Sequence, residues 1–392
     1  MRKAPSNLKS VAFSSTQINL TWDSNTDVPV AYEIFKSTKK DGSYNSIIKT
    51  AIGKNEYKDN EVKVGGTYFY KICVTDAKVN SDTSNFVSAT TPQWMKKDKF
   101  PGDPRKSAVG FSIGDKGYVG LGDNSTSIYK RDLWEFNPKN GVWTQKANFG
   151  GTGRVDAIGF SIGNKGYVGT GYDGEYRKDF WVYDPAKNTW EKIADFEGTP
   201  RKIAVGFSIG KKGYVGTGFD EDLNYLRDFW EYEVSTDTWT KKADFGGRGR
   251  TGAIGFAIGN KGYIGTGNDE NNYAKDFWEY NQMTNRWTKK ANFPGGARRY
   301  AVGFTIGKFG YIATGYDKKR KYRKDLWKYN PARNEWIQEA SPPKSAKPRR
   351  YAVAFSIGNR AYIGTGDEGN VRYYNKDFWE FTETGFMLKH NQ

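Results

Sequence analysis

The chain repeats one stretch six times. The second copy is the clearest: it reads Gly-Phe-Ser-Ile-Gly-Asn-Lys-Gly-Tyr-Val-Gly-Thr-Gly over residues 159–171, followed by Phe180-Trp181-Val182-Tyr183 and Trp190. Twelve of the thirteen tryptophans form two series whose members lie 47 to 52 residues apart: Trp134, Trp181, Trp230, Trp278, Trp327 and Trp379, and Trp94, Trp143, Trp190, Trp239, Trp287 and Trp336. A period near 50 with several short strand signals is typical of a propeller blade, because one four-stranded sheet buries both faces only when neighbours stack on it.

Each copy is predicted to form four antiparallel strands. In the first copy the strands are expected at 107–113, 117–122, 133–136 and around Trp143, with a tight hairpin at Gly114-Asp115-Lys116. Over residues 94–392 the glycine-rich end of the second strand and the two aromatic positions resemble the kelch-repeat family of galactose-oxidase-like propellers. The resemblance implies an all-β propeller, and the six members of each tryptophan series predict six blades. The sequence departs from the usual Gly-Gly of kelch blades, since it reads Gly-Thr-Gly in most copies.

The propeller is expected to span residues 93–392 and to be closed by the strand at 94–98. Trp94 begins a stretch that matches the fourth strand of other copies, whereas the last copy ends without a second tryptophan. Pairing that strand beside Trp379 would complete the sixth blade and remove an open sheet edge. The alternative outer strand, Phe386 to Lys389, stays open.

Residues 1–92 contain no copy of the repeat and predict a separate domain. Seven short strand signals alternate between apolar and polar residues, which is typical of a β-sandwich with one solvated face on each sheet. Trp22, Gly65-Gly66-Thr67 and Asn85-Phe86-Val87 resemble a fibronectin type III domain. That resemblance implies a spacer or adhesion module.

Composition excludes several kinds of site. The chain has one histidine, His390, and one cysteine, Cys73, so a galactose-oxidase-like copper centre, a zinc site and a histidine triad are excluded, and no cofactor or metal is expected. No apolar run is long enough to span a membrane. The N-terminus lacks an apolar signal core. A bacterial protein at the cell surface or outside the cell, its leader absent from this sequence, is nevertheless the expectation, and a cytoplasmic location stays open.

A polar constellation recurs in all six copies. An arginine lies three residues before the first strand's alanine, an aspartate two residues before each tryptophan of the first series, and a tyrosine three residues before each aspartate. One interpretation is architectural, because the planar fork of arginine matches a carboxylate. The other is that the arginines surround the mouth of the channel and bind an anionic ligand.

The loops between the second and third strands differ among copies, so they are the expected place for specificity. They contain aromatic residues, and one of them has a basic tract at 318–321. Another is acidic at 220–222, so a calcium site stays an open alternative. Aromatic faces beside Asp and Asn suit sugars, and they suit a hydrated protein interface equally. The net charge of +17 favours an acidic partner, but no nucleic-acid reader motif is present, which disfavours nucleic acid.

The sequence therefore predicts a non-enzymatic binding or adhesion protein that recognises a carbohydrate or protein partner on the loop face of its propeller; an acidic partner is one of the alternatives. The alternative is a sugar epimerase or mutarotase resembling the kelch-fold sialic acid mutarotases, acting on an acidic sugar. No catalytic residue and no oligomeric state is assigned. The expected binding residues are Arg105, Arg154, Arg201, Arg250, Arg298, Arg349, Tyr172, Phe219, Tyr316, Lys318, Lys319, Arg320 and Lys321.

Overall fold

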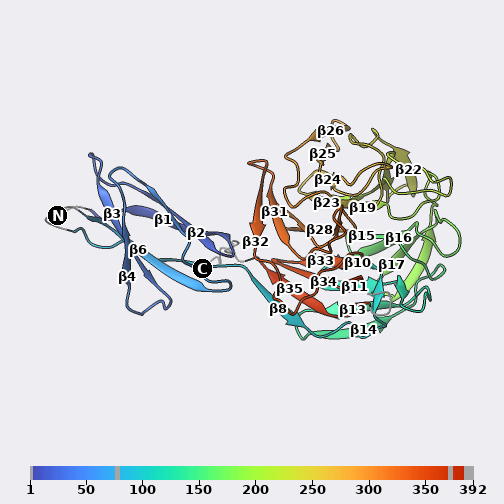
Figure 1. Ribbon diagram of the computed structural model, residues 1–392, viewed down its shortest axis with the longest axis horizontal. Coiled ribbons are helices and arrows are strands. Elements are labelled where there is room, and N and C mark those ends of the chain that lie inside the picture. Colours follow the sequence, from blue (N-terminus) through green and yellow to red (C-terminus); the bar gives the residue numbers. More distant parts are fainter. Residues whose placement is uncertain (1–2, 76–79, 370–373, 384–392) are drawn as a thin grey trace. The chain divides into compact units, whose positions relative to one another are not determined.

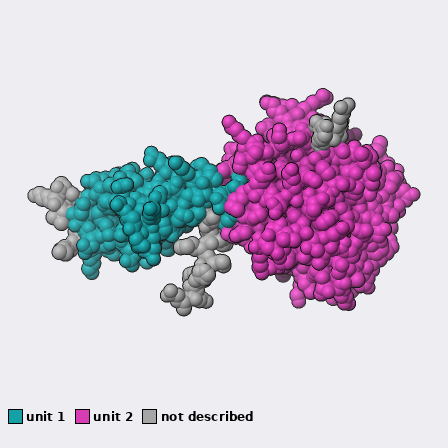
Figure 2. Space-filling model, turned by 90° about the horizontal axis from the view of Figure 1, so that it is seen from below, with its two compact units in different colours: residues 1–94, 381–392 teal, residues 95–380 magenta. Residues whose placement is uncertain are grey.

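The computed structural model describes residues 3–75, 80–369 and 374–383, which form strands, turns and loops without a helix (Figure 1). No membrane-spanning helix therefore occurs among these residues. The chain divides into two compact units, which Figure 2 colours separately: residues 1–94 with 381–392, and residues 95–380.

The N-terminal unit contains two antiparallel sheets. One has the order β1-β2-β5 and the other the order β4-β3-β6-β7. Alternate residues of β2 are buried, and the Trp22 ring packs edge-on against Tyr32 at 5.3 Å, so each sheet contributes one apolar face to a shared core. The strands are β1 (Ser6–Ser14), β2 (Gln17–Asp23), β3 (Ala31–Ser37), β4 (Asn45–Lys49), β5 (Glu56–Asp59), β6 (Thr67–Thr75) and β7 (Val87–Thr90).

The second part of the chain is an all-β propeller of six four-stranded antiparallel sheets, as the repeat predicts. Blades 1 to 5 use consecutive strands of the main series. They are β10 (Val109–Ile113), β11 (Lys116–Gly120), β13 (Leu133–Asn137) and β14 (Val142–Lys146); β15 (Ile158–Ile162), β16 (Lys165–Gly169), β17 (Phe180–Asp184) and β18 (Thr189–Ile193); β19 (Val205–Ile209), β20 (Lys212–Gly216), β21 (Phe229–Glu233) and β22 (Thr238–Lys241); β23 (Ile254–Ile258), β24 (Lys261–Gly265), β25 (Phe277–Asn281) and β26 (Arg286–Lys289); β28 (Val302–Ile306), β29 (Phe309–Ala313), β31 (Leu326–Asn330) and β32 (Glu335–Glu339).

Blade 6 combines strands from two distant parts of the sequence. Its order is β33-β34-β35-β8, so its outermost strand precedes blade 1 in the chain. The bounds are β33 (Val353–Ile357), β34 (Arg360–Gly364), β35 (Phe378–Thr382) and β8 (Gln93–Lys97). The alternative outer strand, Phe386 to Lys389, lies outside the described residues.

The innermost strands close a ring. Each contacts the innermost strand of the next blade, and β10 of blade 1 also contacts β33 of blade 6. Glycines let the blades approach closely: a Cβ at Gly117 would overlap the ring of Phe355, and one at Gly166 would overlap Phe111. The repeated glycine of the second strand is therefore required by the phenylalanine of the neighbouring blade.

Candidate binding face of the propeller

All six repeated arginines are buried within their own blades, with 0–2% of each residue exposed. Arg201 shows the pattern: its two terminal nitrogens donate to the carboxylate of Asp228 at 2.6 and 2.7 Å, and Nη1 also donates to the carbonyl of Thr217 at 3.0 Å. Its guanidinium lies 4.8 Å from the centre of the Phe196 ring. The corresponding pairs are Arg105–Asp132, Arg154–Asp179, Arg250–Asp276, Arg298–Asp325 and Arg349–Asp377.

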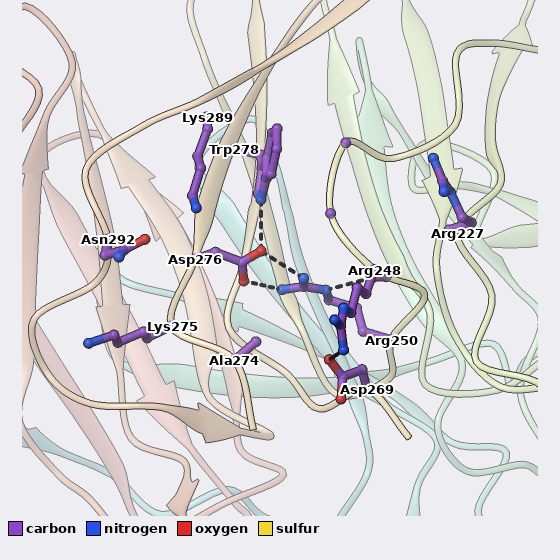
Figure 3. Close-up of a pocket in the computed structure, with 12 residues that line it drawn as sticks. Arg227, Arg248, Arg250, Asp269, Ala274, Lys275, Asp276, Trp278, Lys289 and Asn292 are labelled. Atoms are coloured by element: carbon purple, nitrogen blue, oxygen red, sulfur yellow. Dashed lines mark hydrogen bonds and ion pairs between the residues drawn. The ribbon is translucent and has the colours of Figure 1, made fainter. Parts of the chain in front are cut away.

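The aspartate of each pair also binds a tryptophan. Asp228 accepts a hydrogen bond from Trp230 Nε1 at 2.8 Å, and Figure 3 shows the same unit in blade 4, made by Arg250, Asp276 and Trp278. Burial alone would raise the pKa of Asp228, but the hydrogen bonds and charge of Arg201 outweigh it, so this pKa lies below its ordinary value. These observations give the arginines the architectural role that the sequence left open, since each guanidinium is buried against its own aspartate.

A second recurring feature lies two residues after each arginine and surrounds the propeller axis. All six residues have φ between 53 and 62°, the left-handed region that non-glycine residues seldom adopt. The backbone N–H groups of all but Gly252 donate to the carbonyl of the corresponding residue in the neighbouring blade, for example from Asp156 to Ser107 at 3.1 Å and from Ser107 to Tyr351 at 3.3 Å. We call this set the axial ring: Ser107, Asp156, Ile203, Gly252, Tyr300 and Tyr351.

The axial ring carries one carboxyl and two phenols. The Tyr300 and Tyr351 rings stack at 3.9 Å, and a Cβ at Gly252 would lie 2.8 Å from Tyr300, so a glycine is needed there. Burial raises the pKa of Asp156, and burial together with the charges of Tyr300 and Asp156 raises that of Tyr351. The three groups are therefore neighbours at the centre of the loop face.

Four cations surround the axial ring, each directly after a buried arginine. Lys202 Nζ lies 4.5 Å from the Tyr172 ring centre, and the Arg350 guanidinium lies 5.0 Å from that of Tyr316. Both tyrosines belong to the preceding blade, so these cation–π contacts join neighbouring blades. We call the set the cation ring: Lys106, Lys202, Arg299 and Arg350. The other two blades have Val155 and Thr251 at this position.

Buried polar atoms without partners lie beside the cation ring. Asp123 is 7% exposed, lies 4.0 Å from Lys106 Nζ, and its Oδ1 has no hydrogen-bond partner among the described residues. The same holds for Oδ1 of Asn268, which is 5% exposed, and for Nε of Arg299. Burial, reinforced by Asp156 and Asp367 and opposed by Lys106, raises the pKa of Asp123 to about 6. Unsatisfied buried groups of this kind need an explanation, and a bound ligand is one.

The sequence-predicted aromatic and basic residues lie at different distances from this centre. Tyr172 and Tyr316 contact the cation ring, whereas Phe219 packs edge-on against Tyr225 at 5.0 Å and pairs through its backbone with Lys202. The basic tract Lys318, Lys319, Arg320 and Lys321 is exposed at a loop tip, where Lys318 Nζ donates to Asn272 Oδ1 at 2.7 Å.

The sequence-predicted binding residues include neither the cation ring nor Asp123, which belongs to one of the loops that differ among copies. Two signals point to them: the residue directly after each repeated arginine varies from copy to copy, and so does the residue after the last glycine of the second strand. Backbone pairing brings the two positions together, as for Lys106 and Asp123.

The same face has a basic depression over blade 4. A pocket of about 560 Å³ lies over the Arg250–Asp276 pair, and Arg227, Arg248, Lys275 and Lys289 contribute to its walls (Figure 3). Arg248 lies 3.9 Å from Asp269, and both residues also line a smaller pocket of about 370 Å³ at Leu223–Tyr225. The described part of the chain contains no cluster of His, Cys, Asp and Glu suited to a metal ion.

Comparisons with known proteins identify kelch repeats in the propeller. Residues 166–197 match the Kelch motif, and residues 197–366 match the KLHDC2/KLHL20/DRC7 Kelch-repeats domain. The solved structure of YjhT superposes with a TM-score of 0.63 at 18% identity, covering 76% of this chain and 98% of YjhT, which indicates a shared fold. An amylopullulanase of Thermoanaerobacter thermohydrosulfuricus is 33% identical over 85 residues, 21% of this chain and only 6% of that enzyme.

Proposed function

We propose that this protein binds an acidic carbohydrate at the axial ring and the cation ring of its propeller. The observation that carries the proposal is the buried Asp123 Oδ1, which has no hydrogen-bond partner among the described residues and lies beside cations that contact tyrosine rings. A sugar offers an apolar face to an aromatic ring, hydroxyl donors to Asp123 and Asn268, and, if acidic, a carboxylate to a guanidinium.

The mixture of charges favours an acidic sugar over a polyanion such as nucleic acid. Three carboxyls, Asp123, Asp156 and Asp367, interact electrostatically with one another or with the cation ring, and Arg350 is already paired with Asp367 at 3.0 Å. The phosphates of a nucleic acid would lie close to these carboxyls and be repelled by them. An acidic sugar can place its single carboxylate against a cation while its hydroxyls donate hydrogen bonds to the carboxyls.

We further propose that the N-terminal unit is a fibronectin type III spacer and that the protein works at the cell surface or outside the cell. The two antiparallel sheets of three and four strands, with Trp22 packed on Tyr32 between them, support the first assignment. The location follows from the proposed pairing of a spacer with a glycan-binding domain.

The test is a glycan array probed with the full chain and two matched variants. Arg350→Met removes one cation of the ring, and Arg333→Met removes an exposed arginine from the turn between β31 and β32. Binding to acidic glycans should be weakened by Arg350→Met and unchanged by Arg333→Met. Binding that prefers neutral glycans, or that both variants leave unchanged, would refute the proposal.

A second candidate function is interconversion of sugar anomers or epimers. The pKa of about 6 for Asp123 favours it, because a carboxyl titrating near neutrality can take and return a proton. The test is anomer exchange of glucuronic acid followed by NMR. Enzymatic exchange should rise through pH 6 as Asp123 ionises and should be lost in Asp123→Asn. Exchange at the uncatalysed rate would refute this candidate while leaving binding intact.

A further inference from the structure

Blade 2 lacks a charged pair that the other five blades share. In those blades an ion pair joins the middle of the third strand to the end of the fourth strand or to the residue directly after it. In blade 5 the two charges exchange places. The pairs are Glu135–Lys146 at 3.5 Å, Glu231–Lys242 at 3.3 Å, Glu279–Lys290 at 3.6 Å, Lys328–Glu339 at 2.8 Å and Glu380–Lys97 at 3.4 Å.

Val182 and Ile193 occupy these two positions in blade 2. In blades 1, 3 and 4 the glutamate also accepts a hydrogen bond from the hydroxyl of the second-strand tyrosine, at 2.6 to 2.7 Å. Val182 offers no such acceptor to Tyr167, the corresponding tyrosine of blade 2. Instead, Glu191 lies opposite Val182 on β18, where blades 1, 3 and 4 have a threonine.

A pocket of about 590 Å³ lies at this place, between blades 2 and 3. Its apolar wall is formed by Ile162, Val182, Ile193 and Val234, and Val234 is 41% exposed. We call it the seam pocket. The other lining residues are Gly163, Asn164, Lys165, Tyr167, Glu191, Lys211, Tyr232, Glu233, Ser235 and Asp237.

The charges around the seam pocket favour a cation in the occupant. Three carboxylates face two lysines; Lys165 lies 3.8 Å from Asp184, and Glu233 lies 3.4 Å from Lys212. Glu191 is exposed on the outermost strand, where it can meet a solvated cation. The apolar wall suits an aliphatic or aromatic group, and the volume falls in the range of ligand pockets.

We propose that the seam pocket binds a segment of a partner polypeptide in which a leucine- or phenylalanine-sized side chain precedes a lysine or arginine. The apolar side chain of the partner packs against Val182 and Ile193. A backbone carbonyl of the partner accepts a hydrogen bond from the Tyr167 hydroxyl, and the following lysine or arginine pairs with Glu191. This site is independent of the carbohydrate proposal, because it uses none of the residues of the axial and cation rings.

The test uses the full chain with labelled Ile and Val methyl groups, titrated with the peptide acetyl-Ala-Leu-Lys-Ala-amide and observed by NMR. Shifts should concentrate on Ile162, Val182, Ile193 and Val234, and acetyl-Ala-Gly-Lys-Ala-amide should not produce them. Val182→Glu with Ile193→Lys restores the pair of blades 1, 3 and 4 and should weaken binding by about tenfold or more.

A milder variant separates the charge from the apolar wall. Glu191→Thr changes one exposed residue and should weaken binding of the Leu-Lys peptide several-fold while leaving acetyl-Ala-Leu-Ala-Ala-amide unaffected. Three results would overturn the proposal: no shift at the four methyl-bearing residues with the Leu-Lys peptide, equal binding to the Val182→Glu, Ile193→Lys variant, or equally strong shifts with n-butanol, which would make the occupant a small apolar molecule.

Discussion

Replacing Asp228 by asparagine should destabilise the propeller far more than a typical polar substitution. The carboxylate accepts two hydrogen bonds from Arg201 and one from Trp230 Nε1, and Arg201 is fully buried. Asparagine keeps the shape but removes the charge, so the guanidinium is left buried without its counterion. Removing one partner of a buried ion pair costs about 3–5 kcal/mol, and we expect a loss in this range.

The assay is urea denaturation of the full chain, with the free energy of unfolding compared among variants. The matched control is Asp195→Asn, because Asp195 forms an exposed pair with Lys192, with side chains 42% and 53% exposed. The control should cost less than about 0.5 kcal/mol. Converting both partners, as in Arg201→Met with Asp228→Leu, should cost less than Asp228→Asn alone, because no buried charge is then left unpaired. If Asp228→Asn costs no more than Asp195→Asn, the architectural role of the repeated pairs is wrong.

Two further predictions concern acid and salt. The pKa values of Asp179, Asp228, Asp276 and Asp377 are lowered, because their arginine partners outweigh burial; the stability that they contribute is present above the ordinary aspartate pKa of about 4 and lost as pH falls below it. The melting temperature should therefore fall steeply below about pH 4, and it should fall less in Asp228→Asn than in the unmodified protein. The same acid dependence in the variant and the unmodified protein would contradict this. Replacing the basic tract 318–321 with serines should change stability by no more than about 0.5 kcal/mol but weaken binding of an acidic glycan and flatten its salt dependence, and an unchanged affinity and salt slope would make the tract a solvated loop.

The repeat made the fold predictable, because the constraints on each blade are local and are written six times. The spacing of the tryptophans and glycines indicates the strands, and the recurrence of arginine and aspartate in every copy indicated that they could pair. A residue that every blade needs recurs in every copy of the repeat. Arg201 and its five counterparts are such residues, because each is buried in its blade.

The candidate site was harder to predict because it consists of the residues that vary. Lys106, Val155 and Arg350 occupy one position of the repeat, and only the closed ring brings this position from all six blades around one axis. Asp123 appears in the sequence as one acidic loop residue among several. Its burial and raised pKa depend on Asp156 and Asp367, which come from other blades.

The measurement that tests the binding proposal most directly is calorimetric titration with glucuronic acid and glucose at pH 7.5 and pH 5. The pKa of Asp123 is about 6, so at pH 5 the carboxyl is protonated and the neighbouring cations attract an anion more strongly. We predict that glucuronic acid binds several-fold more tightly at pH 5 than at pH 7.5. The Asp123→Asn variant should bind it at pH 7.5 as tightly as the unmodified protein does at pH 5. The control Asp103→Asn, which changes an exposed carboxylate paired with Lys130, should leave the pH dependence intact. Equal affinity for glucose and glucuronic acid, or a pH dependence that Asp123→Asn does not remove, would contradict the account.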